Sequence, residues 1–281
     1  MERIKKALER ARNERERAQE MGTATPRADE NTKISVLNRA TSSAGVQVEY
    51  TQTKTVGLNA DRLRERRIIA GTGQDAVADT YNVLRTQVLQ RMRKNGWRTL
   101  AITSPGKDNG KTVTAINLGI SLARDVNQTV LLVDLDLKHP SIGTYFLEEV
   151  ATGLGDYLSG ACELGDVLIN PGIERLVIMP GRESLMNSSE MLSTPTMTHL
   201  VEELKSRYPD RIIIFDMPPL LAADDVMAFF PCLDTIMLVV EHGKTTKSDL
   251  QRAYELLTDK AIIGTVLNKS EDLPGNSGLK Y

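Results

Sequence analysis

The sequence predicts an α/β fold in which a mostly parallel sheet is flanked by helices. Short apolar segments alternate with helical ones over most of the chain, and a glycine-containing polar loop follows the first of these apolar segments. The apolar segments are nearly continuous, as in strands that are buried on both faces of a parallel sheet. Together these observations favour a sheet with helices on both faces.

The first element of the predicted folded domain is a helix over residues 75–96. Its apolar residues recur at helical spacing, namely Val77, Tyr81, Leu84, Val88 and Met92. The sequence Asn95-Gly96 indicates where this helix ends. Later strands are expected at residues 98–103, 129–137, 175–180, 211–219, 234–243 and 261–269, and later helices at residues 111–126, 194–208 and 246–259.

The chain divides into regions of different composition. Residues 1–20 are rich in helix formers and opposite charges, which predicts a charged N-terminal helix. Residues 21–74 are expected to form a largely flexible linker. Within it, residues 46–56 alternate apolar and polar, so an edge strand and an extended tail both fit. The folded domain is expected over residues 75–270, followed by a polar tail at 271–281.

Composition excludes several classes of function. The chain has 281 residues and a net charge of −2, so the bulk charge does not favour nucleic acid as a partner. Its two cysteines, Cys162 and Cys232, lie far apart, which favours buried thiols over a metal site or a disulfide. No apolar run approaches the ~18 residues that a spanning helix needs, and a cytoplasmic location is therefore expected.

The loop "SPGKDNGKT" at residues 104–112 matches the end of a phosphate-binding loop, with Gly110, Lys111 and Thr112 in the G-K-[ST] positions. It follows a predicted buried strand and opens a predicted helix, so backbone N–H groups at the helix N-terminus would face phosphates. Lys111 would reach the β- and γ-phosphates, and the Thr112 hydroxyl would ligate Mg²⁺. The predicted nucleotide contacts are Gly106, Lys107, Asp108, Asn109, Gly110, Lys111, Thr112 and Val113.

Three carboxylates follow predicted strands. Asp134 and Asp136 lie in "LLVDLDLKHP", and Asp216 lies in "RIIIFDMPP". A carboxylate at the carboxyl end of a buried strand, beside a phosphate loop, is placed to hold Mg²⁺ or its water shell.

The order of these motifs identifies a resemblance. The phosphate loop is followed by "VDLDLKHP", "GLGDYLSG", "FDMPPLLAADD", "LVVEHGKTTKSDL" and "GTVLNK". This order resembles the bacterial tyrosine kinases of the CpsD/CapB type, in the MinD/ParA-like (SIMIBI) branch of P-loop NTPases, from about Asp79 to Lys269. The resemblance implies an ATP- and Mg²⁺-dependent tyrosine autokinase that regulates polymerisation and export of capsular or extracellular polysaccharide.

The resemblance also implies residue roles. Lys111, Asp134 and Asp136 are expected to be catalytic, one of the two aspartates activating the attacking hydroxyl and the other supporting the metal. Thr112, Asp134 and Asp216 are expected to ligate Mg²⁺. Asn268 matches an asparagine that contacts the adenine base, and Tyr281 is the expected phosphoacceptor.

The implied partner is a membrane-bound polysaccharide co-polymerase or chain-length regulator, which would bring the chain to the inner face of the plasma membrane. A homo-oligomer is also implied. The chain differs from the family pattern at several positions. Lys138 replaces the arginine of the D-x-D-x-R motif, Asn82 replaces the central arginine of an assembly motif, and the tail holds one tyrosine instead of a cluster.

Two alternatives stay open at this point. The chain could be a nucleotide-dependent switch ATPase with little kinase activity, which acts through a membrane partner. A ParA-like partitioning ATPase is a third hypothesis, and it would require salt-sensitive DNA binding.

Overall fold

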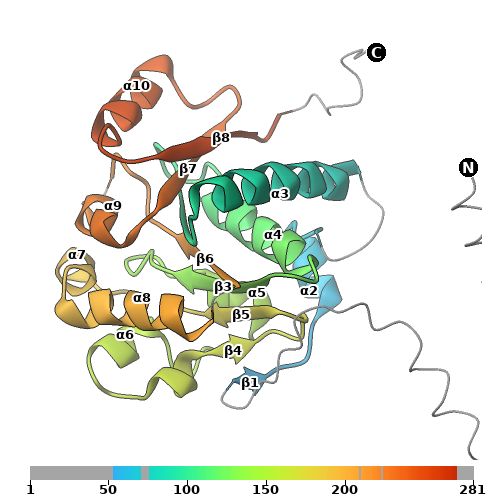
Figure 1. The fold of residues 1–281 in the computed structure, drawn as a ribbon, viewed down its shortest axis with the longest axis vertical. Helices are drawn as coiled ribbons and strands as arrows, with labels where there is room; N and C mark the ends of the chain where they lie inside the picture. Colours follow the sequence, from blue (N-terminus) through green and yellow to red (C-terminus); the bar gives the residue numbers. More distant parts are fainter. Residues whose placement is uncertain (1–52, 71–75, 209, 223, 271–281) are drawn as a thin grey trace, which may run out of the picture. The chain divides into compact units, whose positions relative to one another are not determined.

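The structure is a computed structural model that describes residues 53–70, 76–208, 210–222 and 224–270 (Figure 1). The strands are β1 Lys54–Thr55, β2 Thr99–Thr103, β3 Thr129–Asp134, β4 Ile169–Asn170, β5 Leu176–Met179, β6 Arg211–Asp216, β7 Thr235–Glu241 and β8 Ile262–Asn268. The α-helices are α2 Ala60–Glu65, α3 Ala76–Asn95, α4 Lys111–Ala123, α5 Ile142–Phe146, α6 Leu154–Leu158, α7 Ser188–Leu192, α8 Pro195–Arg207, α9 Asp225–Ala228 and α10 Lys247–Leu256. Short 3₁₀ helices are η2 Leu164–Val167 and η3 Phe230–Cys232.

The strands form one eight-stranded sheet in the order β1-β4-β5-β3-β6-β2-β7-β8. Only the β4–β5 pair is antiparallel among the described strands, so the predicted mostly parallel sheet is confirmed. β6 lies between β3 and β2, with Asp216 paired to Asp134 on one side and to Ile102 on the other. This order brings the C-terminal ends of β3, β6 and β2 together at one edge of the sheet.

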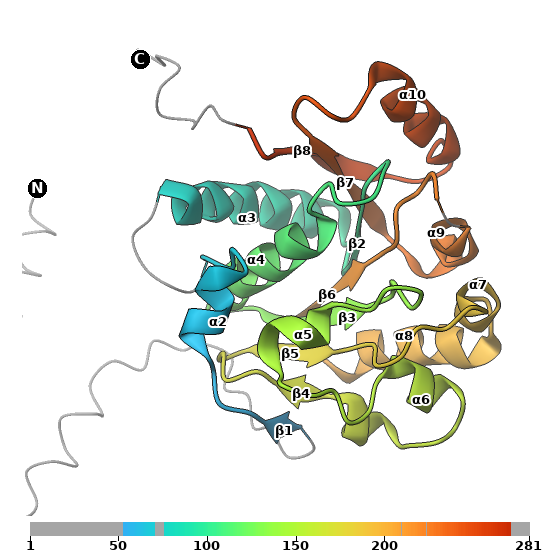
Figure 2. The same cartoon turned by 180° about the vertical axis from the view of Figure 1, so that it is seen from behind.

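Each central strand is buried on both faces, as its continuous apolar sequence predicts. Successive residues of β3 belong to opposite cores: Leu131 and Val133 pack with α8 and α9, whereas Val130 and Leu132 pack with α3 and α4. This is the period-2 alternation of a strand between two helical layers. Figure 2 shows α3 and α4 side by side on one face of the sheet.

The folded part of the chain begins earlier than the predicted boundary near residue 75. β1 pairs with β4, and Leu63, Ile68 and Ala70 are buried in the same core as α3 and α4. Residues 53–70 therefore belong to the folded domain rather than to the predicted linker over 21–74. This packing could not be predicted from the sequence, because few apolar residues form it and they follow no regular period.

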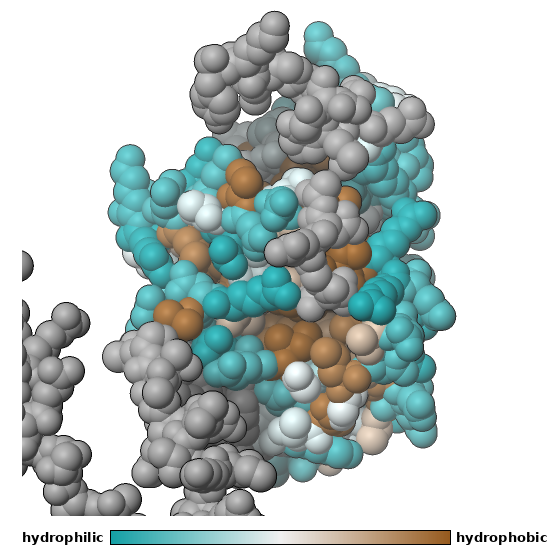
Figure 3. Space-filling model, turned by 90° about the vertical axis from the view of Figure 1, so that its right-hand side faces the viewer, coloured by the Kyte–Doolittle hydropathy of each residue, from teal (hydrophilic) through white to brown (hydrophobic). Residues whose placement is uncertain are grey.

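The other predicted elements of residues 75–270 are confirmed, with ends that shift by a few residues. The predicted helix at 1–20, the tail at 271–281 and most of the 46–56 segment lie outside the described residues. Figure 3 shows one side of the molecule, where hydrophilic residues surround smaller hydrophobic groups. None of the helices in the described ranges is both long enough and apolar enough to span a bilayer.

Candidate nucleotide site

The loop between β2 and α4 adopts a conformation that depends on glycine. Gly110 precedes the first residue of α4 with a φ of 88°, in the left-handed region that favours glycine. A Cβ atom at this position would lie 2.0 Å from Nδ2 of Asn268. Asp108 also has a positive φ, of 62°, which aspartate tolerates better than most residues. The polypeptide thus turns sharply into α4, so that the N–H groups of the first helical turn face outward from the sheet edge.

Residues from the end of β8 hold this loop from the side. The Nδ2 atom of Asn268 donates to the Asn109 carbonyl at 2.9 Å, and Nζ of Lys269 donates to the Asp108 carbonyl at 2.7 Å. The Asn109 side chain in turn donates to Oγ1 of Thr245 at 2.8 Å. These bonds hold the loop in place, and none of them uses the N–H groups that open α4.

Lys111 and Thr112 contact the carboxylates at the sheet edge. Nζ of Lys111 lies 2.8 Å from Oδ2 of Asp136 and 3.8 Å from Oδ1 of Asp216. The Thr112 hydroxyl donates to Oδ2 of Asp216 at 2.6 Å. The structure therefore brings together the lysine, the threonine and the carboxylates that the sequence singled out separately.

Asp134 is held by backbone rather than by a cation. Its Oδ2 atom accepts from the N–H groups of Ser141 and Ile142 at 2.8 and 2.9 Å. Oδ1 of Asp134 and Oδ1 of Asp216 are buried and have no hydrogen-bond partner among the described residues. Buried oxygens without partners are unfavourable unless a ligand or an ion completes them.

The electrostatics of the cluster follow from this burial. Desolvation, followed by repulsion from Asp216, raises the pKa of Asp134 to about 7. Desolvation also raises the pKa of Asp216, although Lys111 opposes it. Burial by itself would lower the pKa of Lys111, but the attraction of Asp216 and Asp136 outweighs it and raises that pKa. Lys111 therefore stays charged beside these carboxylates.

A cavity of about 440 Å³ opens beside these groups. Lys107, Gly110, Lys111 and Val113 line it from the loop and α4, and Asp136 from the end of β3. The remaining lining includes His139, Ser141, Tyr145 and Lys269, which the sequence did not single out for the site. Two of these residues contact the carboxylates through backbone N–H groups: Ser141 donates to Asp134, and His139 donates to Asp136.

The Tyr145 ring lines the cavity and also contacts Arg66 in residues 53–70. The Arg66 guanidinium lies 5.4 Å from the ring centroid and donates to the Thr144 hydroxyl at 2.8 Å. No local motif marks either residue, because their proximity results from how residues 53–70 pack onto α5. Asn268 lies against the loop, while its predicted contact with adenine stays a prediction. Tyr281 lies outside the described residues.

The residues fit a magnesium ion. The oxygens of Asp134 and Asp216 that lack a hydrogen-bond partner and the Thr112 hydroxyl are hard oxygen donors at this edge of the sheet. Mg²⁺ is usually held by one or two carboxylates together with substrate phosphates and water. A phosphate loop, a lysine and this donor set define the site of a P-loop enzyme that binds a nucleotide.

Comparisons with known proteins agree with this class. A family model described as an AAA domain matches residues 98–259. Tyrosine-protein kinase CpsD of Streptococcus pneumoniae serotype 4 is 32% identical over 192 residues, covering 67% of this chain and 82% of the relative. The succinoglycan biosynthesis transport protein ExoP of Rhizobium meliloti is 28% identical over 214 residues, covering 74% of this chain and 27% of that protein.

A solved structure shows the same fold. The kinase domain of the Escherichia coli tyrosine kinase ETK superposes with a TM-score of 0.68 at 25% identity, covering 81% of this chain and 94% of that domain. The chain therefore belongs to the AAA-domain P-loop proteins and, among them, to the bacterial tyrosine-protein kinases related to CpsD. The predicted resemblance and fold class are both confirmed.

Proposed function

We propose that this chain is an ATP-dependent protein-tyrosine kinase that phosphorylates itself or a second copy. One observation carries the proposal: Lys111 and Thr112, at the start of α4, contact Asp136 and Asp216 directly. A phosphate loop alone would suit any nucleotide-binding protein. The additional carboxylates at the end of β3 supply a group that can accept a proton from an attacking hydroxyl.

The transfer would proceed by in-line displacement. The tyrosine oxygen attacks the γ-phosphorus of ATP, the new O–P bond forms, the bond to the β-phosphate oxygen breaks, and ADP leaves. The phenolic proton passes to Asp134 or Asp136. In the structure Asp136 is paired with Lys111 at 2.8 Å. When Lys111 turns to the phosphates, that Asp136 oxygen loses its partner and becomes free to accept a proton.

Mg²⁺ would be held by Thr112, Asp216 and Asp134 with the phosphates, and it supplies charge neutralisation for the transferred group. Lys111 and the N–H groups that open α4 would stabilise the charge that develops on the phosphate oxygens. Asn268 would contact the adenine base, and Lys107, Asp108 and Asn109 would surround the phosphates through their backbone.

We further propose that the kinase regulates the polymerisation and export of an extracellular polysaccharide through a membrane-bound partner. The similarity to ExoP, a succinoglycan biosynthesis transport protein of which the match covers 27%, supports this role. The partner would be a polysaccharide co-polymerase or chain-length regulator, and it would place the chain at the inner face of the plasma membrane.

Intact-mass spectrometry before and after incubation with Mg²⁺ and ATP, followed by site mapping, tests the kinase proposal. Wild-type protein is expected to gain one or more phosphates on tyrosine, with Tyr281 the expected site among the seven tyrosines of the chain. Lys111→Met should abolish the gain, because the lysine that binds the transferred phosphate is lost. Equal phosphorylation of both proteins would contradict the proposal.

A nucleotide-dependent switch is the second candidate. The observation in its favour is that residues 271–281 contain a single tyrosine, Tyr281, as a possible acceptor. Under this alternative the wild type binds ATP but gains no phosphate in the same experiment.

A further inference from the structure

The turn that follows β3 carries Asp136 between the buried Leu135 and Leu137, and it is also held by polar anchors. The His139 N–H donates to Oδ1 of Asp136 at 3.2 Å, which closes the turn on itself. The Leu185 N–H donates to the Leu137 carbonyl at 2.8 Å, and the Ser184 hydroxyl donates to the Lys138 carbonyl at 2.7 Å. The position of the Asp136 carboxylate therefore depends on what surrounds residues 137–139.

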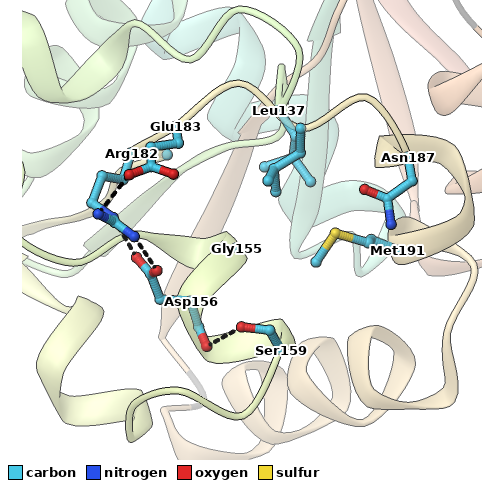
Figure 4. A pocket seen from close by; sticks show the side chains of 10 residues that line it. Leu137, Gly155, Asp156, Ser159, Arg182, Glu183, Asn187 and Met191 are labelled. Atoms are coloured by element: carbon cyan, nitrogen blue, oxygen red, sulfur yellow. Dashed lines mark hydrogen bonds and ion pairs between the residues drawn. The ribbon is translucent and has the colours of Figure 1, made fainter.

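A pocket lies beside this turn. Leu137 is 1% exposed, yet it borders a cavity of about 320 Å³ that lies between α6 and the segment before α7. Figure 4 shows Leu137 facing this cavity with Met191 across it, and Arg182 paired with Asp156 at the rim. Leu137 also belongs to the buried hydrophobic core of this face of the sheet, so the turn is held both by this side chain and by its polar anchors.

A further anchor is the ion pair between Lys138 and Asp225. Nζ of Lys138 lies 3.1 Å from Oδ2 of Asp225, the first residue of α9. Asp225 is 1% exposed, and its other oxygen accepts a hydrogen bond from the Ser188 hydroxyl on α7. A buried carboxylate is costly unless it is paired and hydrogen-bonded, so both partners hold it in one place.

The segment that leads to Asp225 also touches the phosphate loop. It starts at Asp216, and the N–H groups of Leu220 and Leu221 donate to the carbonyls of Ser104 and Pro105 at 2.8 and 3.2 Å. One stretch of chain thus contacts the loop that holds phosphate at one end and the turn that carries Asp136 at the other. Among the described residues, two side chains of this stretch form ion pairs with Lys138 in the turn, Asp224 and Asp225. Only the Asp225 side chain is buried.

We propose that Asp225 is a positioning residue, which fixes Lys138 and with it the turn that aims Asp136 at the reacting groups. The proposal rests on the kinase function proposed above for its reaction, and it assigns Asp225 a role that the phosphate-loop and metal-binding motifs do not include. Misplacing a catalytic group by a fraction of a bond length lowers the rate of the chemical step more than it weakens nucleotide binding.

The neighbouring aspartate provides a matched control. Asp224 also faces Lys138, at 3.9 Å, but its side chain is 68% exposed and pairs with the hydroxyl of Ser189. Asp224→Asn and Asp225→Asn remove the same charge from adjacent positions. Only the second breaks the buried pair. Lys138→Met removes the pair from the other side, and Lys138→Arg keeps it.

The experiment measures kcat and KM for ATP from both phosphotyrosine formation and ATP hydrolysis, together with the Tm of each variant. Asp225→Asn and Lys138→Met are each expected to lower kcat by about tenfold or more while KM for ATP changes less than about twofold. Lys138→Arg and Asp224→Asn should keep kcat within about twofold of wild type. The double variant Asp225→Asn/Lys138→Met should lose no more than the worse single variant, because one pair is broken in each case.

Several results would overturn the proposal: a wild-type kcat in folded Asp225→Asn or Lys138→Met, an equal loss in Asp224→Asn, or losses that multiply in the double variant. If Asp225→Asn does not fold, the comparison of Lys138→Met with Lys138→Arg decides. Failure of the kinase function is a separate result, because wild type would then hydrolyse ATP without forming phosphotyrosine. The same variants measured by hydrolysis still test the positioning of Asp136.

Discussion

Two buried polar sites are joined by α4, and they differ in how completely their hydrogen bonds are made. Asn117, in the middle of α4, is 0% exposed and uses both ends of its amide. Its oxygen accepts from the N–H groups of Ile69 and Ala70, and its nitrogen donates to the carbonyls of Arg67 and Val113. These bonds hold residues 67–70 against α4.

The carboxylates near the start of α4 are equally buried but incomplete. Asp134 and Asp216 are both 0% exposed, and each has one oxygen without a hydrogen-bond partner among the described residues. A satisfied buried amide stabilises the fold, whereas an unsatisfied carboxylate opposes it. The difference indicates that Asn117 stabilises the fold, whereas the carboxylates serve to bind a ligand or an ion.

The largest effect expected from this comparison is on activity at the carboxylates. Asp216→Asn should lower tyrosine phosphorylation by about 10²-fold or more, because a charged metal ligand is replaced by a neutral amide. The Tm without nucleotide should stay equal or rise, since a buried charge is removed. Rates from phosphotyrosine formation and melting curves check this, with Asp125→Asn, remote from the site, as the control. A large loss of Tm would mean that the carboxylate supports the fold after all.

Asn117→Ala should have the opposite profile. Removing an amide that makes four hydrogen bonds in the interior is expected to lower the free energy of unfolding by about 2–3 kcal/mol. Nucleotide affinity should change little if the domain remains folded. Urea unfolding measures the loss, and Thr86→Ala, which removes one hydroxyl bond on the exposed side of α3, is the control. An unchanged urea midpoint would contradict the conclusion that the Asn117 hydrogen bonds stabilise the fold.

The pH dependence of stability sharpens the comparison further. Burial raises the pKa of Asp134 to about 7, so the folded chain binds a proton that the unfolded chain has already released. The free energy of unfolding contributed by this group is therefore highest in acid and falls as pH rises from about 4 to about 7. Asp134→Asn should stabilise the nucleotide-free protein at pH 8 and much less at pH 5. A Tm difference from wild type that does not depend on pH would contradict the assignment.

The smallest effect is expected at Asp108, in the phosphate loop. Asp108→Gly relieves a φ of 62° but adds freedom to the unfolded chain, so the free energy of unfolding should change by less than about 1 kcal/mol. Because a carboxylate is removed from the wall of the phosphate cavity, the Kd for ATP should fall by a few-fold. Calorimetric titration with ATP measures the Kd, and unchanged or weaker binding would contradict a repulsive role for the Asp108 carboxylate.

Much of the candidate site could be predicted from sequence, for a local reason. A strand, a G-K-T loop and a helix follow one another within residues 98–126, and the conformation of such a loop is set by neighbours in the chain. The roles of Asp134 and Asp216 followed from one rule of topology, since parallel strands end at the same edge of a sheet. The pairing of these two residues in register agrees with that rule.

Other parts of the site could not be predicted because they depend on contacts between distant segments. Tyr145 faces the cavity beneath Arg66, and Lys269 holds the loop from the end of β8. Lys138 was recognised only as a departure from the family motif, and its buried partner Asp225 lies 87 residues away. No periodicity or spacing in the sequence marks such pairs.

The sequence by itself determined the fold class, the nucleotide loop and the set of carboxylates, because strand burial and loop conformation are encoded in short stretches of residues. Tertiary structure alone decided that residues 53–70 join the domain and that Lys111 rests on Asp136. It also decided that the Asp136 turn is anchored by Asp225. The physical reason is that burial and charge pairing depend on which distant groups the completed sheet brings together. A single buried partner can change both the pKa and the position of a charged side chain.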